Sequence, residues 1–391
     1  MDLPLPFRHI DTVLLLLSDP IDRMSEPLKH TPYYDINVAA GAKMVSFAGF
    51  EMPIQFPQGI TAEHQQVRNA CGVFDVSHMG EFLVRGPQAI DFVNYVTTND
   101  VNALAIGQVQ YSAILSEQGT FVDDCLVYRY AEKDHLMMVV NGSNKDKDLA
   151  HIKQYLGKFD ATLEDVSDAI GLLAVQGPKA QEILQPLVDK PLDDIKYYWF
   201  AETTVAGIPM TISRTGYTGE DGFELYHDAN DAQKLWAALM ATNAIVPVGL
   251  GCRDSLRLEM GMALYGNDID DTITPLESGL GWLVKMKKGD FVGKAALEAQ
   301  KAAGIQRKLV GFTFVEKAIP RHGYPVFVDG NPSGTVMSGI MSPSLGVGLG
   351  TAYVPLAHAK EGNKLEVEIR GKRVEGTIVT APYWKKGSVK R

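Results

Sequence analysis

Hydrophobic positions change their spacing along the chain, and this change divides the sequence into two regions. Up to about residue 304, segments with helical spacing alternate with short apolar runs and strand-like alternation. Beyond Gln306 the helical spacing stops, and short alternating segments separated by Gly, Pro and Asn turns take its place. The pattern predicts an α+β region, 24–304, followed by an all-β module, 305–391, shaped as a small barrel or jelly-roll-like sheet.

Individual elements can be placed on this pattern. We expect Thr61 to cap the first helix, with Glu63 in its first turn. The Gly346–Gly350 run has no strand-to-helix context for phosphate binding, so we expect a turn that leads into a strand. Helices are predicted over 61–71, 88–96, 145–156 and 229–239, and strands over 73–76, 82–84, 110–115, 121–130, 135–141, 172–175, 203–214, 222–227, 309–314, 334–340, 365–370 and 374–379.

One short pattern occurs twice. Arg85-Gly-Pro-Gln-Ala89 follows one predicted strand and opens a helix, and Gln176-Gly-Pro-Lys-Ala180 does the same later in the chain. Proline suits the start of a helix because its missing N–H is not needed there. The two copies indicate two related α+β subdomains, each a sheet with helices on one face.

Composition excludes several classes of function. The chain has 391 residues, 46% hydrophobic and 21% charged, which is typical of a globular protein of two or three domains. A net charge of −10 argues against nucleic-acid binding, which needs a basic surface. The apolar run 13–17 is too short to span a membrane. We expect residues 1–23 to be a poorly ordered extension or the product of an upstream start codon, and we infer no secretion from them.

The cysteines and histidines indicate no metal site. Cys71, Cys125 and Cys252 lie far apart with no C-x-x-C spacing, which fits a reducing compartment. The nine histidines have no paired ligand spacing. His78 is a candidate acid or base, but no partner for it is visible, so a hydrogen-bonded structural histidine is the better interpretation.

The richest candidate site is the run Gly216-Tyr-Thr-Gly-Glu-Asp-Gly-Phe-Glu224. Its glycines allow tight turns and close approach of the backbone. Phe223 and Leu225 would anchor a strand and hold Glu224 on the opposite face. A carboxylate in that place suits a ligand with two adjacent N–H donors, such as a guanidine-like heterocycle edge. A hairpin with solvated acids is the alternative.

Asp123 and Asp124 lie in a predicted strand, so their side chains should point to opposite faces. Asp123 would share the more apolar face with Cys125 and Val127, where loss of solvent raises the proton affinity of a carboxylate. Such a group could act as a base or stabilise charge. Two aspartates after the 117–120 turn are also consistent with turn residues.

Arg253 lies near a predicted helix start with Arg257 one turn later, where a guanidinium could bind a carboxylate. Ion pairs of Arg253 with Asp254, or of Arg257 with Glu259, are the alternative. Other polar and aromatic candidates have structural explanations of their own: Asn141 as a turn cap, Tyr111 and Tyr217 as core or rim aromatics, and the 383–386 tail as a frayed end or a cover for an anionic ligand.

No Ser-His-Asp or Cys-His grouping, P-loop or dinucleotide fingerprint appears in the sequence. In combination, however, its motifs resemble the T-protein family of the glycine cleavage system, the tetrahydrofolate-dependent aminomethyltransferases, from about Pro32 to Tyr383. The motifs are Phe74-Asp-Val-Ser-His-Met79, Gly107-Gln-Val-Gln-Tyr-Ser112, Phe121-Val-Asp-Asp124, Val139-Val-Asn141, Ala174-Val-Gln-Gly-Pro178, Thr215-Gly-Tyr-Thr-Gly-Glu-Asp-Gly222, Gly249-Leu-Gly-Cys-Arg-Asp-Ser-Leu-Arg-Leu-Glu259, Leu264-Tyr-Gly266 and Asp290-Phe-Val-Gly293.

The resemblance implies a three-domain cloverleaf around a central folate cavity. Two domains would be ferredoxin-like, α+β and interleaved in sequence, and the third a C-terminal β module. By the family's pattern, Asp123 matches the essential acid and Glu224 the carboxylate that binds the pterin edge. Arg253, Tyr111, Asn141 and Tyr217 match other pocket residues, and Tyr383 resembles the C-terminal residue that reaches the folate.

The resemblance also implies the reaction and its partners. The family's substrate is an aminomethyl group on the lipoyl arm of the H-protein carrier. Tetrahydrofolate, as co-substrate, takes up the methylene group while ammonia leaves, and no metal is required. T-proteins occur in bacterial cytoplasm and in mitochondria. The acidic start of this chain is unlike a transit peptide, so we expect a cytoplasmic protein.

Two alternatives use the same fold. One is a folate-dependent demethylase of a small methylated substrate, although no flavin domain of the dimethylglycine and sarcosine dehydrogenase type is visible. The other is a non-catalytic folate-binding regulator of iron–sulfur assembly. Its Lys-Gly-Cys-Tyr-x-Gly-Gln stretch is missing, since Gly251-Cys-Arg-Asp254 stands at the corresponding place.

Overall fold

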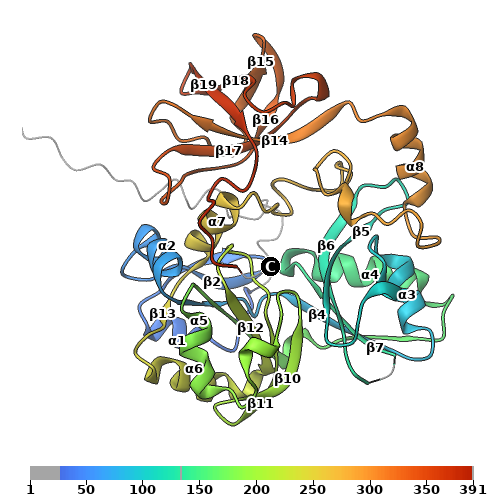
Figure 1. The fold of residues 1–391 in the computed structure, drawn as a ribbon, viewed down its shortest axis with the longest axis vertical. Helices are drawn as coiled ribbons and strands as arrows, with labels where there is room; N and C mark the ends of the chain where they lie inside the picture. The colour runs from blue at the N-terminus through green and yellow to red at the C-terminus, as the bar shows by residue number, and fades with distance from the viewer. Residues whose placement is uncertain (1–26, 133, 390–391) are drawn as a thin grey trace, which may run out of the picture.

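Three structural units meet around the middle of the molecule (Figure 1). The computed structural model describes residues 27–132 and 134–389, so the predicted extension 1–23 lies outside the described residues. The units are a five-stranded lobe, a six-stranded lobe and a closed six-stranded barrel. The predicted α+β architecture with a C-terminal β module is confirmed, and the module is a barrel.

The five-stranded lobe is formed by one continuous stretch of chain. Its sheet has the order β5-β6-β7-β4-β8, and all of its strand pairs are antiparallel. Helices α3 and α4 pack on one face through Phe92, Val93 and Ile152. The elements are β4 (Gly80–Arg85), α3 (Ala89–Val96), β5 (Val109–Leu115), β6 (Phe121–Arg129), β7 (His135–Val140), α4 (Lys145–Leu156) and β8 (Thr162–Asp165).

The six-stranded lobe combines an early segment with a later one. Its order is β10-β11-β12-β9-β3-β13, so β3 crosses into the sheet formed mainly after residue 169. Its elements are α1 (Tyr34–Ala39), α2 (Ile60–Asn69), β3 (Gly72–Asp75), β9 (Ile170–Gln176), α5 (Ala180–Leu184), β10 (Phe200–Val205), β11 (Ile208–Ser213), β12 (Gly222–Asp228), α6 (Ala232–Ala241), β13 (Val246–Pro247) and α7 (Leu250–Glu259), with the small sheet β1 (Lys43–Phe47) and β2 (Phe50–Gln55) beside it.

The two lobes repeat one topology, as the duplicated Gly-Pro pattern predicts. In each, a strand is followed by a helix and then by three antiparallel strands, the last of which pairs with the first: β4 with β7, and β9 with β12. Gly86 and Gly177 both have positive φ, and a Cβ on Gly177 would lie 2.2 Å from the Ala70 carbonyl oxygen. Glycine is therefore required there because the backbone turns sharply against a neighbouring segment.

The barrel closes with the order β14-β17-β16-β15-β18-β19, and β19 pairs back to β14. Its core contains Phe312, Val326 and Val367. The predicted turn at Gly346–Gly350 does lead into a strand, β17. Its elements are β14 (Arg307–Phe314), β15 (Pro325–Val328), β16 (Asn331–Met341), β17 (Gly348–Pro355), β18 (Lys364–Ile369) and β19 (Lys372–Val379), and α8 (Lys294–Ala303) precedes them.

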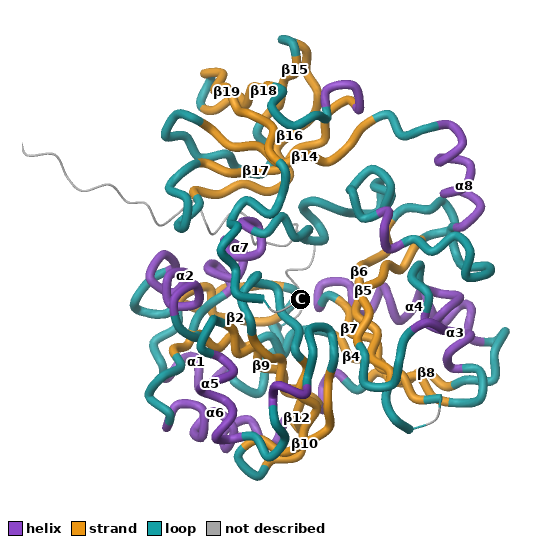
Figure 2. The backbone as a smooth tube through the Cα atoms, in the orientation of Figure 1, coloured by secondary structure: helices purple, strands orange, loops and turns teal. Residues whose placement is uncertain are grey.

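The lobes pack against each other through the sheet faces opposite those covered by α3 and α4 in one lobe and by α5 and α6 in the other. One buried cluster joins Val139 and Tyr128 of the five-stranded sheet to Ala174 and Tyr226 of the six-stranded sheet, and Leu256 of α7 also contributes. In the tube view the barrel lies above α7, and the two lobes lie below it on either side (Figure 2). The faces that meet in this cluster carry the candidate site.

Most predicted elements match, but the first helix begins differently. The predicted cap at Thr61 is wrong, because α2 starts at Ile60 after Gly59 and no side chain caps it. Glu63, in its first turn, instead accepts hydrogen bonds from the backbone N–H groups of Phe56 and Gly249. Within residues 27–132 and 134–389, no helix is long and apolar enough to cross a membrane.

Candidate functional site

The strand β6 separates Asp123 from Asp124. Asp123 lies opposite Ile114 of β5, and Ile114 belongs to the core under α3 and α4. Asp124 lies on the opposite face with Leu126, toward the six-stranded lobe. Asp123 is 0% exposed, whereas Asp124 is half-buried. The alternation expected from the sequence is therefore present, and it directs only Asp124 toward the space between the lobes.

Asp123 is held by donors from the segment after β7. One oxygen accepts from Asn141 Nδ2 at 2.9 Å and Asn144 Nδ2 at 2.7 Å, and the other accepts from the Asn141 backbone N–H at 2.9 Å. Burial raises the pKa of Asp123, although these hydrogen bonds oppose the shift. The contacts do not test the predicted catalytic role of Asp123, but they engage its carboxylate with the segment between β7 and α4.

Asp124 has the contacts expected of a reactive carboxylate. Tyr111 Oη donates to it at 2.9 Å, and Asn141 Nδ2 donates to its other oxygen at 2.9 Å. Burial and then the charge of Asp123 raise its pKa to about 7, against the effect of these hydrogen bonds. Asn141 thus bridges the two aspartates. A carboxylate with a pKa near neutrality can accept a proton at physiological pH.

The six-stranded lobe contributes Glu224 from β12. Its side chain shares a face with Tyr226, which packs in the cluster between the lobes. Glu224 is half-buried, and Thr215 Oγ1 donates to it. Burial raises its pKa, while the Thr215 hydrogen bond and the charge of Arg253 act in the opposite direction. The predicted strand placement of Glu224 is confirmed.

The other acids of the glycine-rich run have structural partners. Glu220 pairs with Arg68 at 2.7 Å, and Asp221 pairs with Arg214 at 2.6 Å, with all four side chains buried. Gly219 has φ of 79°, and a Cβ there would lie 2.4 Å from the sulfur of Met260. The run is therefore a tightly packed turn rather than a solvated hairpin.

Arg253 lies on α7 beside Tyr217, with its guanidinium carbon 4.6 Å from the ring centroid. Tyr217 Oη donates to the backbone oxygen of Ala263, which fixes the ring. In the part of the chain that the structure describes, no carboxylate forms an ion pair with Arg253. Arg257 instead pairs with Asp254 and Asp268, so both ion pairs considered as alternatives from the sequence are wrong.

Tyr383 lies apart from these groups. Its ring packs with Leu258 of α7 and with Ile340 and Leu349 of the barrel, and its backbone N–H donates to the Glu259 carbonyl. No hydrogen bond or ring contact joins it to the other candidates among residues 27–132 and 134–389. Its role as a folate contact stays a prediction.

The chain after Tyr383 packs against the glycine-rich turn. Trp384 stacks over Arg68, with the guanidinium carbon 5.5 Å from the ring centroid. Ser388 donates to Glu220 through both its backbone N–H and its hydroxyl, at 2.8 and 2.6 Å. This tail is therefore packed and not frayed, and its role as a cover for an anionic ligand stays a prediction.

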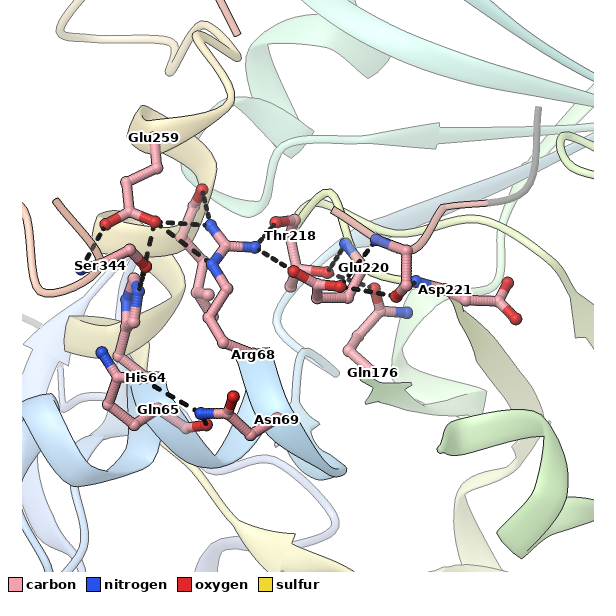
Figure 3. Close-up of polar contacts among 12 residues, drawn as sticks. His64, Gln65, Arg68, Asn69, Gln176, Thr218, Glu220, Asp221, Glu259 and Ser344 are labelled. Atoms are coloured by element: carbon pink, nitrogen blue, oxygen red, sulfur yellow. Dashed lines mark hydrogen bonds and ion pairs between the residues drawn. The ribbon is translucent and has the colours of Figure 1, made fainter. Parts of the chain in front are cut away.

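Arg68 forms the centre of a buried polar junction (Figure 3). It pairs with Glu220 of the turn and with Glu259 at the end of α7, and it donates to the Thr218 carbonyl. Glu259 also accepts from the hydroxyl of Ser342 and the backbone of Ser344, beyond the end of β16. The junction therefore joins the six-stranded lobe to the barrel and to the tail.

Comparison with known proteins defines the family. Residues 33–288 match the model of the GCVT N-terminal domain, and residues 307–385 match that of the glycine cleavage T-protein C-terminal barrel domain. The chain belongs to the glycine cleavage T-protein family.

Similar proteins cover nearly the whole T-protein chain. An aminomethyltransferase of Chloroherpeton thalassium is 48% identical over 360 residues, which is 91% of this chain and 99% of that protein. One of Thermosipho melanesiensis is 48% identical over 364 residues, 93% of this chain and 99% of that protein. The crystal structure of glycine cleavage system aminomethyltransferase T from Bartonella henselae has a TM-score of 0.88 at 34% identity, covering 93% of this chain and all of that one.

The sequence did not identify two features of this T-protein. Asp124 is the neighbour of Asp123 in the sequence, and its place on the same strand face as Leu126 is the signal that could have distinguished the two aspartates. Arg68 gave no such indication, because its partners Glu220 and Glu259 are remote in sequence.

Among residues 27–132 and 134–389, no cluster of three His, Cys, Asp or Glu side chains could hold a metal.

A cavity of about 570 Å³ lies away from this group of residues. Lys147, His151 and Asp271 are among its lining residues, and Tyr111, Asp124 and Glu224 are not. The residues between the lobes are the stronger candidate site, because they combine a carboxylate whose pKa is near neutrality with an arginine that has no ion-pair partner among the described residues.

Proposed function

We propose that this protein is the aminomethyltransferase of a glycine cleavage system. It transfers the methylene group of an aminomethyl-lipoyl carrier, the H-protein, to tetrahydrofolate and releases ammonia. The observation that carries the proposal is the set of half-buried polar groups between the lobes of a T-protein chain: Tyr111, Asp124, Asn141, Glu224 and Arg253.

The residues of the six-stranded lobe suit the pterin ring of tetrahydrofolate, which has adjacent N–H donors. The carboxylate of Glu224 can accept further hydrogen bonds besides the one from Thr215. Two parallel charge-assisted hydrogen bonds to a carboxylate orient a planar ligand. Arg253 offers guanidinium donors that no described carboxylate uses. Tyr217 stacks against Arg253 and fixes its direction.

The residues of the five-stranded lobe suit the chemistry. Tetrahydrofolate, when bound, supplies the nitrogen that takes up the methylene group. In this proposal, Asp124 accepts the proton released there and stabilises the cationic carbon that develops. Tyr111 and Asn141 hold its two oxygens in place. We therefore propose Asp124 as the catalytic residue and Asp123 as the residue that orients Asn141.

Holding the reacting groups in line is the main task left to the protein. Such alignment lowers the activation free energy of the transfer by about several kcal/mol. A cytoplasmic location and the H-protein as carrier belong to the same proposal. The two alternative functions, demethylation of a small substrate and folate binding without catalysis, differ from it in their products.

One assay separates the three functions. The purified protein is incubated with tetrahydrofolate and aminomethylated, lipoylated H-protein, and ammonia and methylenetetrahydrofolate are measured. We expect both products in equal amounts, and none with H-protein that carries lipoyl without the aminomethyl group. Folate binding without either product would support the alternative of a folate-binding regulator that has no catalytic activity. Turnover only with a small methylated amine would support the demethylase.

A further inference from the structure

Asp148 is a buried acid on the far side of β6 from the proposed catalytic residue. It lies in α4, is 0% exposed, and faces the same core as Asp123. Neither of its carboxylate oxygens accepts a hydrogen bond from any N–H or O–H donor of the described residues. Asn144, four residues before Asp148 at the start of α4, donates to Asp123, so Asp148 lies on the helix face turned toward Asp123, and the two carboxyl groups interact.

Two ionised carboxylates in contact in a buried place repel each other strongly, so the pair must hold a proton. The donors around the pair decide which residue carries it. Asp123 accepts three N–H groups, from Asn141 and Asn144, which favour its ionised form. Asp148 receives none, and both burial and the charge of Asp123 raise its pKa. The proton therefore belongs on Asp148.

The other charged groups nearby do not change this assignment. Lys147, the neighbouring residue on α4, is exposed and donates to Tyr265 Oη at 2.7 Å. It forms no ion pair with Asp148 within residues 27–132 and 134–389. Cys125 lies on the same face of β6 as Asp123, and burial and the charges of Asp123, Asp124 and Asp148 raise the pKa of its thiol, so it stays neutral. Asp124, on the other face, adds further negative charge.

A carboxylate can accept about four hydrogen bonds, and three of those of Asp123 are assigned. We propose that Asp148 is a positioning residue that keeps a proton and donates it to Asp123 as the fourth bond. The Asp123 anion, held in this way, orients the amide of Asn141, and the same amide nitrogen donates to Asp124. The chain Asp148–Asp123–Asn141–Asp124 thus passes through the sheet from the helix side to the site.

This inference rests on the proposed function only for its effect on turnover. Its first test needs no activity: infrared difference spectra at pH 8 between the wild-type protein and Asp148→Asn. We expect the wild type to show the carbonyl band of a protonated carboxylic acid that Asp148→Asn lacks. Asp146→Asn, on the exposed side of the same helix, is the matched control and should keep the band. A wild-type spectrum without that band overturns the proposal.

The second test is kinetic. Asp148→Leu removes the donor, and we expect kcat to fall tenfold or more with little change in KM for tetrahydrofolate. Asp148→Asn can still donate to Asp123 through its amide, so we expect its kcat to lie much closer to that of the wild type than to that of Asp148→Leu. Equal kcat values for Asp148→Leu and Asp146→Asn would overturn the proposal, and so would an Asp148→Asn variant as slow as Asp148→Leu. If the wild type has no aminomethyltransferase activity, the proposed function fails and the infrared test still decides the protonation.

Discussion

Asp123 and Asp124 are neighbours in the chain, yet their carboxylates lie on opposite faces of β6 and share one amide group. Asn141 Nδ2 donates to both, at 2.9 Å in each case. One aspartate belongs to the core under α4, and the other faces the six-stranded lobe. The two residues should therefore respond differently to the same substitution.

Asp124→Asn should remove most turnover without unfolding the protein. The variant loses the proton acceptor, and general acid–base groups typically contribute roughly 10²–10⁴-fold in rate. Asp123→Asn should instead lower stability, because its amide would face the N–H donors of Asn141 and Asn144, and a buried unsatisfied donor costs about 1–3 kcal/mol. Thermal unfolding and kcat measured on both variants check this. A fully stable Asp123→Asn protein without turnover would return the catalytic role to Asp123.

The pH dependence of turnover should follow Asp124. Its pKa is raised to about 7, so the ionised form that accepts a proton is lost as the pH falls below that value. Tyr111→Phe removes a hydrogen bond that lowers this pKa, so the acid side of the pH–rate profile should move to higher pH. Measuring kcat/KM from pH 5.5 to 9 for both proteins tests the shift. An unchanged profile in Tyr111→Phe would exclude Asp124 as the titrating group.

Glu224→Ala should weaken tetrahydrofolate binding by about 2–3 kcal/mol, because it removes a charged acceptor from paired N–H donors. Calorimetric titration measures this directly. Glu202→Ala is the matched control, since Glu202 is an exposed acid on β10, at the edge of the same sheet and two strands from β12. An affinity equal in both variants would contradict the pterin contact.

The buried junction around Arg68 should make the free energy of unfolding depend on pH in the acidic range. Burial alone would raise the pKa of Glu259, but contacts with His64, Ser342 and Arg68 outweigh it and hold the pKa at about 2. A carboxylate whose pKa is lowered by folding stabilises the protein above its unfolded pKa, and this contribution is lost as the pH falls toward 2. It is on the order of 3 kcal/mol.

Glu259→Gln should remove that acid-dependent part and lower stability at neutral pH by about 3–5 kcal/mol, because it leaves Arg68 with one charged partner. Urea unfolding between pH 2.5 and 7 measures both effects. Glu164→Gln breaks an exposed ion pair with Arg85 and should cost at most about 1 kcal/mol. Equal losses in the two variants would show that burial of the junction contributes nothing.

Local patterns in the sequence predicted much of this fold. Strand alternation placed Glu224 opposite Phe223 and Leu225, and the doubled Gly-Pro pattern indicated two related lobes. The sequence could not show which face of β6 the second lobe covers, because that depends on contacts between Tyr128 and Tyr226, almost a hundred residues apart. For the same reason, the family's pattern directed attention to Asp123, while packing between the lobes favours Asp124.

The crossing of β3 into the later sheet has a consequence for synthesis on the ribosome. Strands β4 to β8 all lie between Gly80 and Asp165, so the five-stranded lobe has every partner it needs once that stretch has emerged. Strand β3 is made earlier, yet it pairs with β9 and β13, which follow. The first lobe able to fold during translation is therefore the one that carries Asp124, and the earlier segment must stay unpaired until the six-stranded lobe is complete.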